Sequence, residues 1–88
     1  MGTIKLMVYP NPNTGIFIAQ YHLIKPTDVK ITLSNVNGKI IDEQILINQQ
    51  IGTQVFERKI KHLENGGVYF IKIETAYENA LQKIVIEP

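Results

Sequence analysis

The sequence predicts an all-β protein, a sandwich of about seven short antiparallel strands, and three observations lead to that fold class. Apolar and polar residues alternate with a period of two along almost the whole chain, and no segment has the 3.6-residue period of an amphipathic helix. Turn-forming residues interrupt the alternation roughly every 8 to 12 residues. The length suits a single domain over residues 1–88, and 44% of the residues are apolar, enough for a thin core.

Turn signals divide the chain into strands. A Pro-Asn-Pro-Asn-Thr-Gly run over residues 10–15 ends the first strand, because proline has no N–H to give to a ladder. Asn37-Gly38 predicts a hairpin of type I′, in which both central residues have positive φ. With further breaks at residues 25–28, 48–52, 62–67 and 77–79, strands are expected at residues 4–9, 17–23, 29–34, 39–47, 54–60, 68–75 and 80–87.

Composition narrows the classes of partner. Cysteine is absent, so neither disulfides nor thiolate chemistry contributes. The net charge is +1, and strand alternation would place Lys59 and Lys61 on one face and Arg58 on the other, which indicates a solvated strand and no nucleic-acid-binding stripe. No apolar run approaches the roughly 18 residues of a membrane helix, and no secretory signal peptide opens the chain. We expect Met1-Gly2 to be a start placed before an excised piece of a larger protein.

Catalytic and metal-binding groups are sparse. Ser34 is the only serine, and it lies in mid-strand with neither an acid nor a histidine at motif spacing. His22 and His62 are the only histidines. The chain has no cysteine, and its only aspartates are Asp28 and Asp42, so no recognisable zinc-site spacing is present. Calcium loops with repeated aspartates are also missing. We therefore expect no metal and no cofactor.

Carboxylate pairs and one glycine pair are the remaining chemical candidates. Asp42 with Glu43, or Glu57 with Glu74, could supply an acid and a base, yet on a sandwich such residues are ordinarily solvated strand positions. The glycines at 66–67 are followed by no helix whose N-terminus could hold a phosphate. The sequence therefore predicts a domain that is not an enzyme and has no small-molecule substrate.

Three segments, taken in order, resemble a known family. They read YPNPNTGIF over residues 9–17, VKITLSNVNGK over residues 29–39, and LENGGVYFIKI over residues 63–73, with QKIVI closing at residues 82–86. Together they are similar to the type A C-terminal sorting domain of proteins that Bacteroidota export through the type IX (Por) secretion system. The resemblance covers nearly the whole chain, and the combination is more specific than the Pro-Asn-Pro-x-x-Gly run alone.

The resemblance implies both a fold and a function. The fold is an immunoglobulin-like sandwich at the very end of a cargo protein, to which the domain is covalently joined. The outer-membrane translocon would recognise the domain after its transit through the periplasm, and a sortase-like protease would commonly remove it. The cargo would then be released or attached at the cell surface. Neither a cofactor nor nucleic acid takes part.

The matched segments also single out ten residues for structure or for contact with the translocon. The two prolines of the first segment should end a strand, Gly15 should supply a conformation that a side chain would obstruct, and Gly38 should serve the hairpin. Tyr69 is expected to pack its ring in the core with its hydroxyl hydrogen-bonded at an edge. Lys83 is the residue that we most readily assign to recognition. The full set is Pro10, Asn11, Pro12, Gly15, Asn35, Gly38, Lys39, Gly67, Tyr69 and Lys83.

The chain departs from the family pattern at three places. Asn35 stands where the family usually has Asp, and because asparagine can still cap the turn backbone, we expect folding to survive the loss of the charge. The loop over residues 63–67 is one residue longer than the usual pattern. The chain ends at Glu87-Pro88, whereas family members often finish near a basic residue.

Two other functions fit an all-β domain of this size. A carbohydrate-binding or adhesive module would present a platform of aromatic rings, but tryptophan is absent and the tyrosines belong to different strands and turns, namely Tyr9, Tyr21, Tyr69 and Tyr77. A structural spacer would need no partner at all. Sorting is the function that the sequence favours.

Overall fold

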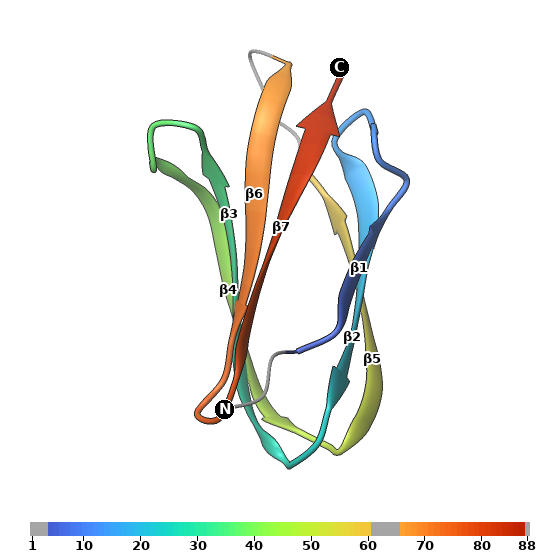
Figure 1. Ribbon diagram of the computed structural model, residues 1–88, viewed down its shortest axis with the longest axis vertical. Coiled ribbons are helices and arrows are strands. Elements are labelled where there is room, and N and C mark those ends of the chain that lie inside the picture. Colours follow the sequence, from blue (N-terminus) through green and yellow to red (C-terminus); the bar gives the residue numbers. More distant parts are fainter. Residues whose placement is uncertain (1–3, 61–65, 88) are drawn as a thin grey trace.

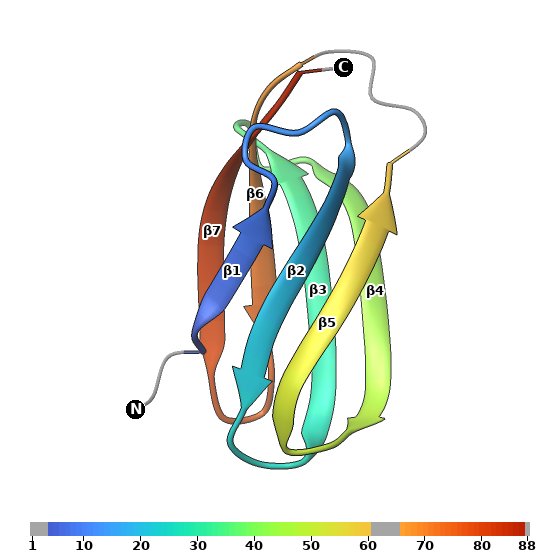
Figure 2. The same ribbon diagram turned by 90° about the vertical axis from the view of Figure 1, so that its right-hand side faces the viewer.

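The computed structural model describes residues 4–60 and 66–87, which form a two-layer sandwich of antiparallel strands (Figure 1, Figure 2). The predicted all-β fold class is confirmed, and every predicted strand is present with its ends within two residues of the expected ones. No helix of the described residues is long and apolar enough to cross a membrane. The strands are β1 (Leu6–Tyr9), β2 (Ile16–Leu23), β3 (Thr27–Asn35), β4 (Ile40–Gln49), β5 (Gly52–Lys59), β6 (Gly67–Glu74) and β7 (Asn79–Ile86).

The strands divide into two sheets. One has the order β1-β2-β5, the other has the order β4-β3-β6-β7, and every strand pair is antiparallel. The chain crosses between the layers after β2, after β4 and after β5. Such crossings are typical of immunoglobulin-like sandwiches, as the resemblance implied.

The core lies between the two sheets and follows the sequence alternation. On β2 the inward residues Phe17, Ala19, Tyr21 and Leu23 are at most 2% exposed, whereas the residues between them face outward. Burial of each large apolar side chain stabilises the fold by about 1.5–3 kcal/mol. The other buried apolar residues, from both sheets and the segment before β1, are Ile4, Val8, Val29, Ile31, Leu33, Tyr69, Ile71, Ile73, Ile84 and Ile86.

The hairpin between β3 and β4 differs from its prediction. Gly38 has a φ of 83°, but Asn37 has no positive φ, so the expected type I′ turn is wrong. The Gly38 N–H donates to the Asn35 carbonyl (3.0 Å), and the Asn35 N–H donates to the Lys39 carbonyl (3.0 Å). The loop is therefore one residue longer than a type I′ turn, and a loop of this kind needs positive φ only at its last residue.

The two ends of the sandwich carry different segments. At one end, which we call the motif end, lie the loop over residues 10–15, the β3–β4 hairpin and the last residues of β7 (Figure 1). At the other end, which we call the base, lie the turns that join β2 to β3, β4 to β5 and β6 to β7. The described chain begins at the base, where the Ile4 N–H donates to the Asn79 carbonyl (3.3 Å).

Candidate functional site

The loop over residues 10–15 lies along the outer edge of β7 (Figure 1). The Asn11 carboxamide reaches β7 with both of its polar atoms: Nδ2 donates to the Lys83 carbonyl (3.3 Å), and Oδ1 accepts from the Val85 N–H (2.9 Å). These are the kinds of bond that a neighbouring strand would make. Because the edge of a sheet otherwise presents unpaired backbone groups, Asn11 covers part of that edge.

Asn13 continues along the same edge with its backbone. Its N–H donates to the Val85 carbonyl (3.0 Å), and its carbonyl accepts from the Glu87 N–H (2.7 Å), as a short parallel bridge. With the Asn11 bonds, the loop satisfies a continuous row of β7 edge groups. Since β7 and β1 belong to different sheets, the loop joins the two layers, and we call the side formed by β1, β7 and this loop the clamped side.

The side chain of Asn13 holds the loop in shape. Its Nδ2 donates to the Pro10 carbonyl (3.0 Å), its Oδ1 accepts from the Gly15 N–H (2.8 Å), and only 5% of the residue is exposed. Gly15 has a φ of 103°, a left-handed conformation that favours glycine, so its predicted backbone role is confirmed. The Gly15 carbonyl accepts from the Ile60 N–H (2.9 Å), which ties the loop to the chain just after β5.

The two prolines lie exposed on this loop beside Asn11. β1 ends at Tyr9, directly before Pro10, as the lack of ladder donors predicted. The Tyr9-Pro10 and Asn11-Pro12 peptide bonds are both cis. The exposed residues of the loop are Pro10, Asn11, Pro12 and Thr14.

Asn35 caps the β3–β4 hairpin with its side chain. Its Oδ1 accepts from the Asn37 N–H (2.9 Å) and from the Lys39 N–H (3.0 Å). Both bonds go to an oxygen, so a carboxamide caps this turn as a carboxylate would. The prediction that asparagine can cap the turn in place of the family's aspartate is confirmed.

Gly67 and Tyr69 lie on β6 near the motif end. Gly67 begins the strand with a φ of 139° and pairs with Ile86 of β7. Tyr69 is 7% exposed and lies between Asn35 of β3 and Ile84 of β7 in the sheet register, so the predicted burial of its ring is confirmed. The preceding residues 63–65, including the extra loop residue, lie outside the described residues.

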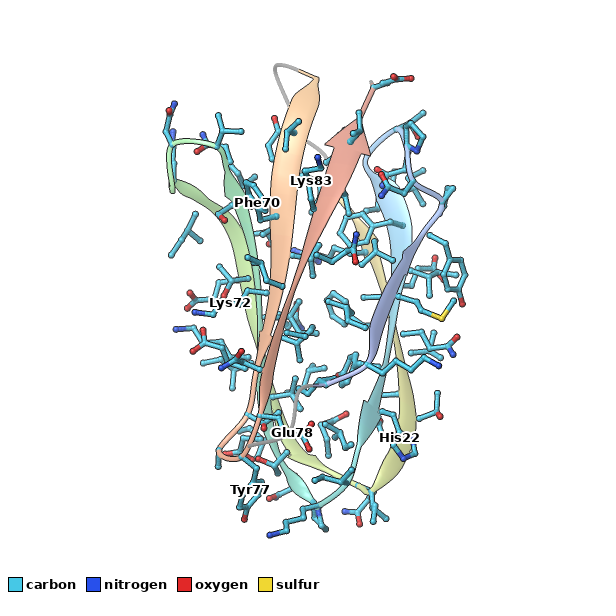
Figure 3. The ribbon with its side chains drawn as sticks, in the orientation of Figure 1. His22, Phe70, Lys72, Tyr77, Glu78 and Lys83 are labelled. Carbon is cyan, nitrogen blue, oxygen red and sulfur yellow. The ribbon has the colours of Figure 1, made fainter. Side chains whose placement is uncertain are left out.

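Lys83 combines a bonded backbone with an exposed side chain. Its carbonyl accepts the Asn11 bond, while its side chain stands on the outer face of the larger sheet, opposite Phe70 (Figure 3). Two other lysines of this face have carboxylate partners, since Lys30 pairs with Glu43 (3.6 Å) and Lys72 pairs with Glu74 (3.6 Å). Among the described residues no carboxylate forms a salt bridge with the Lys83 ammonium.

The opposite side of the sandwich, between the edge strands β4 and β5, is closed by charges. Arg58 donates from Nε to Oδ2 of Asp42 (2.7 Å) and from Nη2 to Oδ1 (2.6 Å), and we call this the ion-pair side. The hydrogen bond with Asp42 raises the pKa of Arg58 above its ordinary value, against a smaller opposing effect of burial. Asp42 is therefore an ion-pair residue between the layers, which corrects its expected role as a solvated strand position. The predicted separation of Arg58 from Lys59 onto opposite faces is confirmed, whereas Lys61, predicted to share the face of Lys59, lies outside the described residues.

The structure does not assemble the weak catalytic candidates. Glu57 lies on β5 and Glu74 on β6, and both face outward from different sheets, so they do not converge. His22 is exposed on β2, with Nδ1 3.3 Å from Oγ1 of Thr53, and His62 lies outside the described residues. Within residues 4–60 and 66–87 no three histidine, aspartate or glutamate side chains are grouped so that they could hold a metal ion.

The tyrosines do not form a common platform. Tyr21 and Tyr69 are buried, at 1% and 7% exposure. Tyr9 and Tyr77 are 39% and 49% exposed, but Tyr9 ends β1 at the motif end and Tyr77 lies in the β6–β7 turn at the base. This arrangement weakens the carbohydrate-binding alternative, because sugars stack on adjacent rings.

The residues that the sequence singled out gather in the half of the sandwich at the motif end (Figure 1). They form two groups there, one on the loop and β7 and one on the β3–β4 hairpin and β6. Sequence reasoning missed the attachment of the loop to β7, and it quoted Asn13 within the motif without giving it a role. The Asn-x-Gly spacing of Asn13 and Gly15 was the available signal, because asparagine side chains often bond the backbone two residues ahead.

These features define a class of protein: a small immunoglobulin-like sandwich in which a Pro-Asn-Pro loop covers the edge of the last strand. A family model described as the secretion system C-terminal sorting domain matches residues 7–87. A search of curated proteins finds no match. The chain belongs to the family of secretion system C-terminal sorting domains, and the type IX sorting signal implied by the resemblance is confirmed at that level. Such a signal belongs to a larger protein that is exported toward the outer membrane and the cell surface.

Proposed function

We propose that this domain directs a covalently attached cargo protein across the outer membrane through the type IX secretion translocon, without catalytic activity of its own. The cargo transits the periplasm and reaches the cell surface or the medium, where a sortase-like protease removes the domain. Membership of the sorting-domain family supports the pathway. No cofactor, nucleic acid or small-molecule substrate takes part.

The translocon contacts the clamped side at the motif end in this proposal. Pro10, Asn11 and Pro12 are exposed on the loop, and the Lys83 side chain is exposed on the strand that the loop covers. Lys39 is exposed on the β3–β4 hairpin, a second part of the motif end that β6 separates from β7 in the sheet. A rigid surface loses little conformational entropy on binding, which suits a signal that must be recognised on many different cargos.

The other motif residues act through folding. Gly15 and Gly38 hold backbone conformations with positive φ, Asn35 caps the hairpin, and Tyr69 packs in the core. Gly67 begins β6 beside the end of β7. Their substitution would impair export by changing the shape of the motif end.

The observation that carries the proposal is the pair of bonds from Asn11 to Lys83 and Val85. They join two parts of the family pattern that are 72 and 74 residues apart in the chain. The Pro-Asn-Pro motif and the C-terminal strand are thus one structural unit, as expected if the export machinery reads them together.

A fusion experiment tests the proposal. Residues 3–88 are joined to the C-terminus of a reporter that carries a periplasmic targeting signal, in a bacterium that possesses the type IX system. We expect the reporter at the cell surface or in the medium, and its loss from there when the translocon is deleted. Retention in the periplasm, while a fusion to another cargo's sorting domain is exported, would contradict the proposal.

The recognition role of Lys83 has its own test. Lys83→Ala should reduce export of the fusion several-fold without lowering the thermal stability of the domain, since the side chain is exposed and unpaired within the described chain. Lys59→Ala, which removes an exposed lysine from the outer face of the smaller sheet, is the matched control. Equal export of both variants would remove Lys83 from the recognised surface.

A further inference from the structure

Strand β4 is an open edge of the larger sheet. It pairs only with β3, while the opposite edge of the same sheet, β7, is covered by the loop over residues 10–15 (Figure 2). β4 is also the longest strand of the described chain. An uncovered edge presents a row of backbone N–H and C=O groups to which another strand can bond.

The backbone groups that β4 presents at this edge belong to Glu43, Ile45 and Ile47. In an antiparallel ladder, the direction of the backbone bonds alternates from one residue to the next. Asn48 directs its N–H toward β3, where it donates to Oδ1 of Asp28 (2.9 Å). The odd-numbered residues that precede it on the strand therefore direct their backbone groups away from β3.

The registers of the larger sheet give the same direction independently. At the β7 edge, the N–H and the carbonyl of Val85 bond outward to the loop (2.9 and 3.0 Å). The alternation, followed from Val85 through β6 and β3, places Gln44 and Leu46 on the side of β4 that bonds to β3. Among the described residues, Gln49 is the one whose side chain bonds an outward group, since its Nε2 donates to the Ile47 carbonyl (3.2 Å). That bond is exposed, so a second strand can replace it.

The outward part of β4 has the same order of polar and apolar residues in both directions. Residues 43–49 read Glu-Gln-Ile-Leu-Ile-Asn-Gln, with the apolar residues in the middle and polar residues on both sides. Antiparallel pairing of two copies about Leu46 places Ile45 of each copy opposite Ile47 of the other. Glu43 then lies opposite Gln49, so no like charges face each other. A two-fold contact requires a self-complementary surface, and this segment is self-complementary.

The side chains at the centre of this segment have room for a partner. Ile45 and Ile47 stand on the outer face of the sheet and are 60% and 65% exposed. Leu46 points to the inner face and is partly buried against the core. Pairing with a second β4 would cover the two isoleucines with apolar neighbours, which removes apolar surface from water.

The neighbouring edge strand β5 lacks this pattern. Its exposed residues are Thr53, Val55, Glu57 and Lys59, so its one exposed aliphatic side chain lies among polar and charged residues. Charged side chains on an edge strand oppose pairing with another chain. Of these two edges, β4 is therefore the one suited to pairing.

We propose that this chain forms a two-fold symmetric dimer in which β4 of one copy pairs antiparallel with β4 of a second copy about Leu46. Ile45 of each copy exchanges N–H···O bonds with Ile47 of the other, and the two larger sheets become one continuous sheet. The outer edges of the joined sheet are the two β7 strands, each covered by its loop, so the assembly stops at the dimer. The clamped side of each copy stays exposed, and the dimer goes beyond the proposed function without depending on it.

The bend at the end of β4 makes this dimer a weak one. Asn48 has a φ of 55°, and the β3–β4 register shifts between Thr27 and Val29, so the regular part of β4 ends near Ile47. The ladder between the two copies is therefore short. We expect a Kd on the order of 100 µM, as for other small, transient interfaces.

Amide hydrogen exchange of the 88-residue chain, resolved by residue with NMR, tests the proposal. In dilute solution the amides of Gln44 and Leu46 should be protected by β3, whereas those of Ile45 and Ile47 should exchange fast. At about ten times Kd about 80% of the chains are paired, so the Ile45 and Ile47 amides should exchange about fivefold more slowly than in dilute solution. The amide of Val36, in the exposed β3–β4 hairpin, should stay fast at every concentration.

A pair of variants places the contact on β4. Ile47→Glu is the test variant and Val55→Glu is the matched control, since these two aliphatic side chains are 65% and 63% exposed on edge strands. In the paired strands the new carboxylate at position 47 would lie diagonal to Glu43 of the second copy and to its own counterpart, and like charges there repel. Ile47→Glu should keep the Ile45 amide fast at every concentration, whereas Val55→Glu should behave as the parent. Melting temperatures in dilute solution, expected to match the parent, check that both variants fold.

Each other outcome contradicts the proposal. Fast exchange of the Ile45 and Ile47 amides up to about 1 mM, with a monomer mass in sedimentation, would overturn it and leave the edge to a strand of a different protein. A dimer that survives Ile47→Glu would place the contact elsewhere on the molecule. Association beyond the dimer would contradict the closure of the β7 edge by the loop. None of these outcomes depends on whether the reporter fusion is exported.

Discussion

The two open sides of the sandwich are closed in different ways. On the clamped side, the Pro-Asn-Pro loop covers the edge of β7 with neutral hydrogen bonds from Asn11 and Asn13. On the ion-pair side, one charged contact between Arg58 and Asp42 joins β4 to β5, and these side chains remain 36% and 22% exposed. The contact between the sheets on the clamped side therefore depends on hydrogen-bond geometry, whereas the contact on the ion-pair side depends on charge.

The difference between the two sides indicates which of them carries the recognised surface. Partly exposed ion pairs contribute little to stability and are screened by salt, so they can be exchanged at small cost. Hydrogen bonds from a loop to a strand edge require one loop shape and one strand register, and so they specify a surface. The Pro-Asn-Pro segment of the family pattern and the strand that carries Lys83 both lie on the side that specifies a surface, and we assign recognition to that side.

The largest effect on stability should come from Asn13, whose side chain holds the loop over residues 10–15 in shape. Asn13→Ala removes the partners of the Gly15 N–H and the Pro10 carbonyl in a site that is only 5% exposed, and should lower the free energy of unfolding by about 2 kcal/mol. Urea denaturation of the isolated domain measures this loss. Asn37→Ala, in the exposed hairpin loop, is the matched control and should change stability by less than about 0.5 kcal/mol. Equal losses for both variants would mean that the loop is not held by Asn13.

The hairpin that leads into β4 should give the next largest effect. Gly38→Val forces a β-branched residue to a φ of 83° and should cost about 1–2 kcal/mol. An added Cβ would meet no atom within 4 Å, so the cost comes from the backbone conformation alone. Gly38→Asn should therefore cost less, since asparagine tolerates positive φ. Unchanged thermal stability of the valine variant would refute the assigned turn.

Removal of the buried Tyr21 hydroxyl should change the free energy of unfolding in the opposite direction. The Tyr21 hydroxyl is buried and has no hydrogen-bond partner within residues 4–60 and 66–87, so Tyr21→Phe should raise the free energy of unfolding by about 1 kcal/mol. Burial raises the pKa of Tyr21 above 10.0, so its neutral form is favoured in the folded state. The stabilisation that comes from binding this proton more tightly in the folded state is complete below the unfolded pKa of about 10. It is lost as the pH rises through the folded pKa. Between pH 8 and pH 11, values chosen to span about 10, the free energy of unfolding should fall more steeply for the parent than for the phenylalanine variant. An equal fall in both proteins would contradict this prediction.

The smallest effect should be that of the ion pair. Asp42→Asn should lower the free energy of unfolding by about 0.5 kcal/mol at low salt, and the loss should shrink toward zero near 1 M salt. A double-mutant cycle with Arg58→Met isolates the pairwise contribution. A coupling energy above about 2 kcal/mol that persists near 1 M salt would contradict the view that the ion pair holds its side only weakly.

The sequence predicts the parts of this molecule that follow local patterns. Alternation and turn residues define the strands and core, and Gly15 and Gly38 could be assigned their backbone roles from turn chemistry. The hairpin type was wrong because the side chain of Asn35, outside the Asn37-Gly38 pair, supports a longer loop. The contacts that build the clamp join residues 72 and 74 positions apart, and no local pattern encodes such contacts.

Export of a matched pair of variants tests the central claim most directly. Asn11→Ala removes the carboxamide bonds to β7 on the clamped side, and Asp42→Asn removes the ion pair on the other side. Both are measured in the reporter fusion, with the amount of exported reporter as the readout and the stability of each domain determined separately. We predict that Asn11→Ala leaves most of the reporter in the periplasm while Asp42→Asn is exported at the parent level. Equal export of the two variants, or losses that follow stability alone, would contradict the assignment of the sorting signal to the loop and β7.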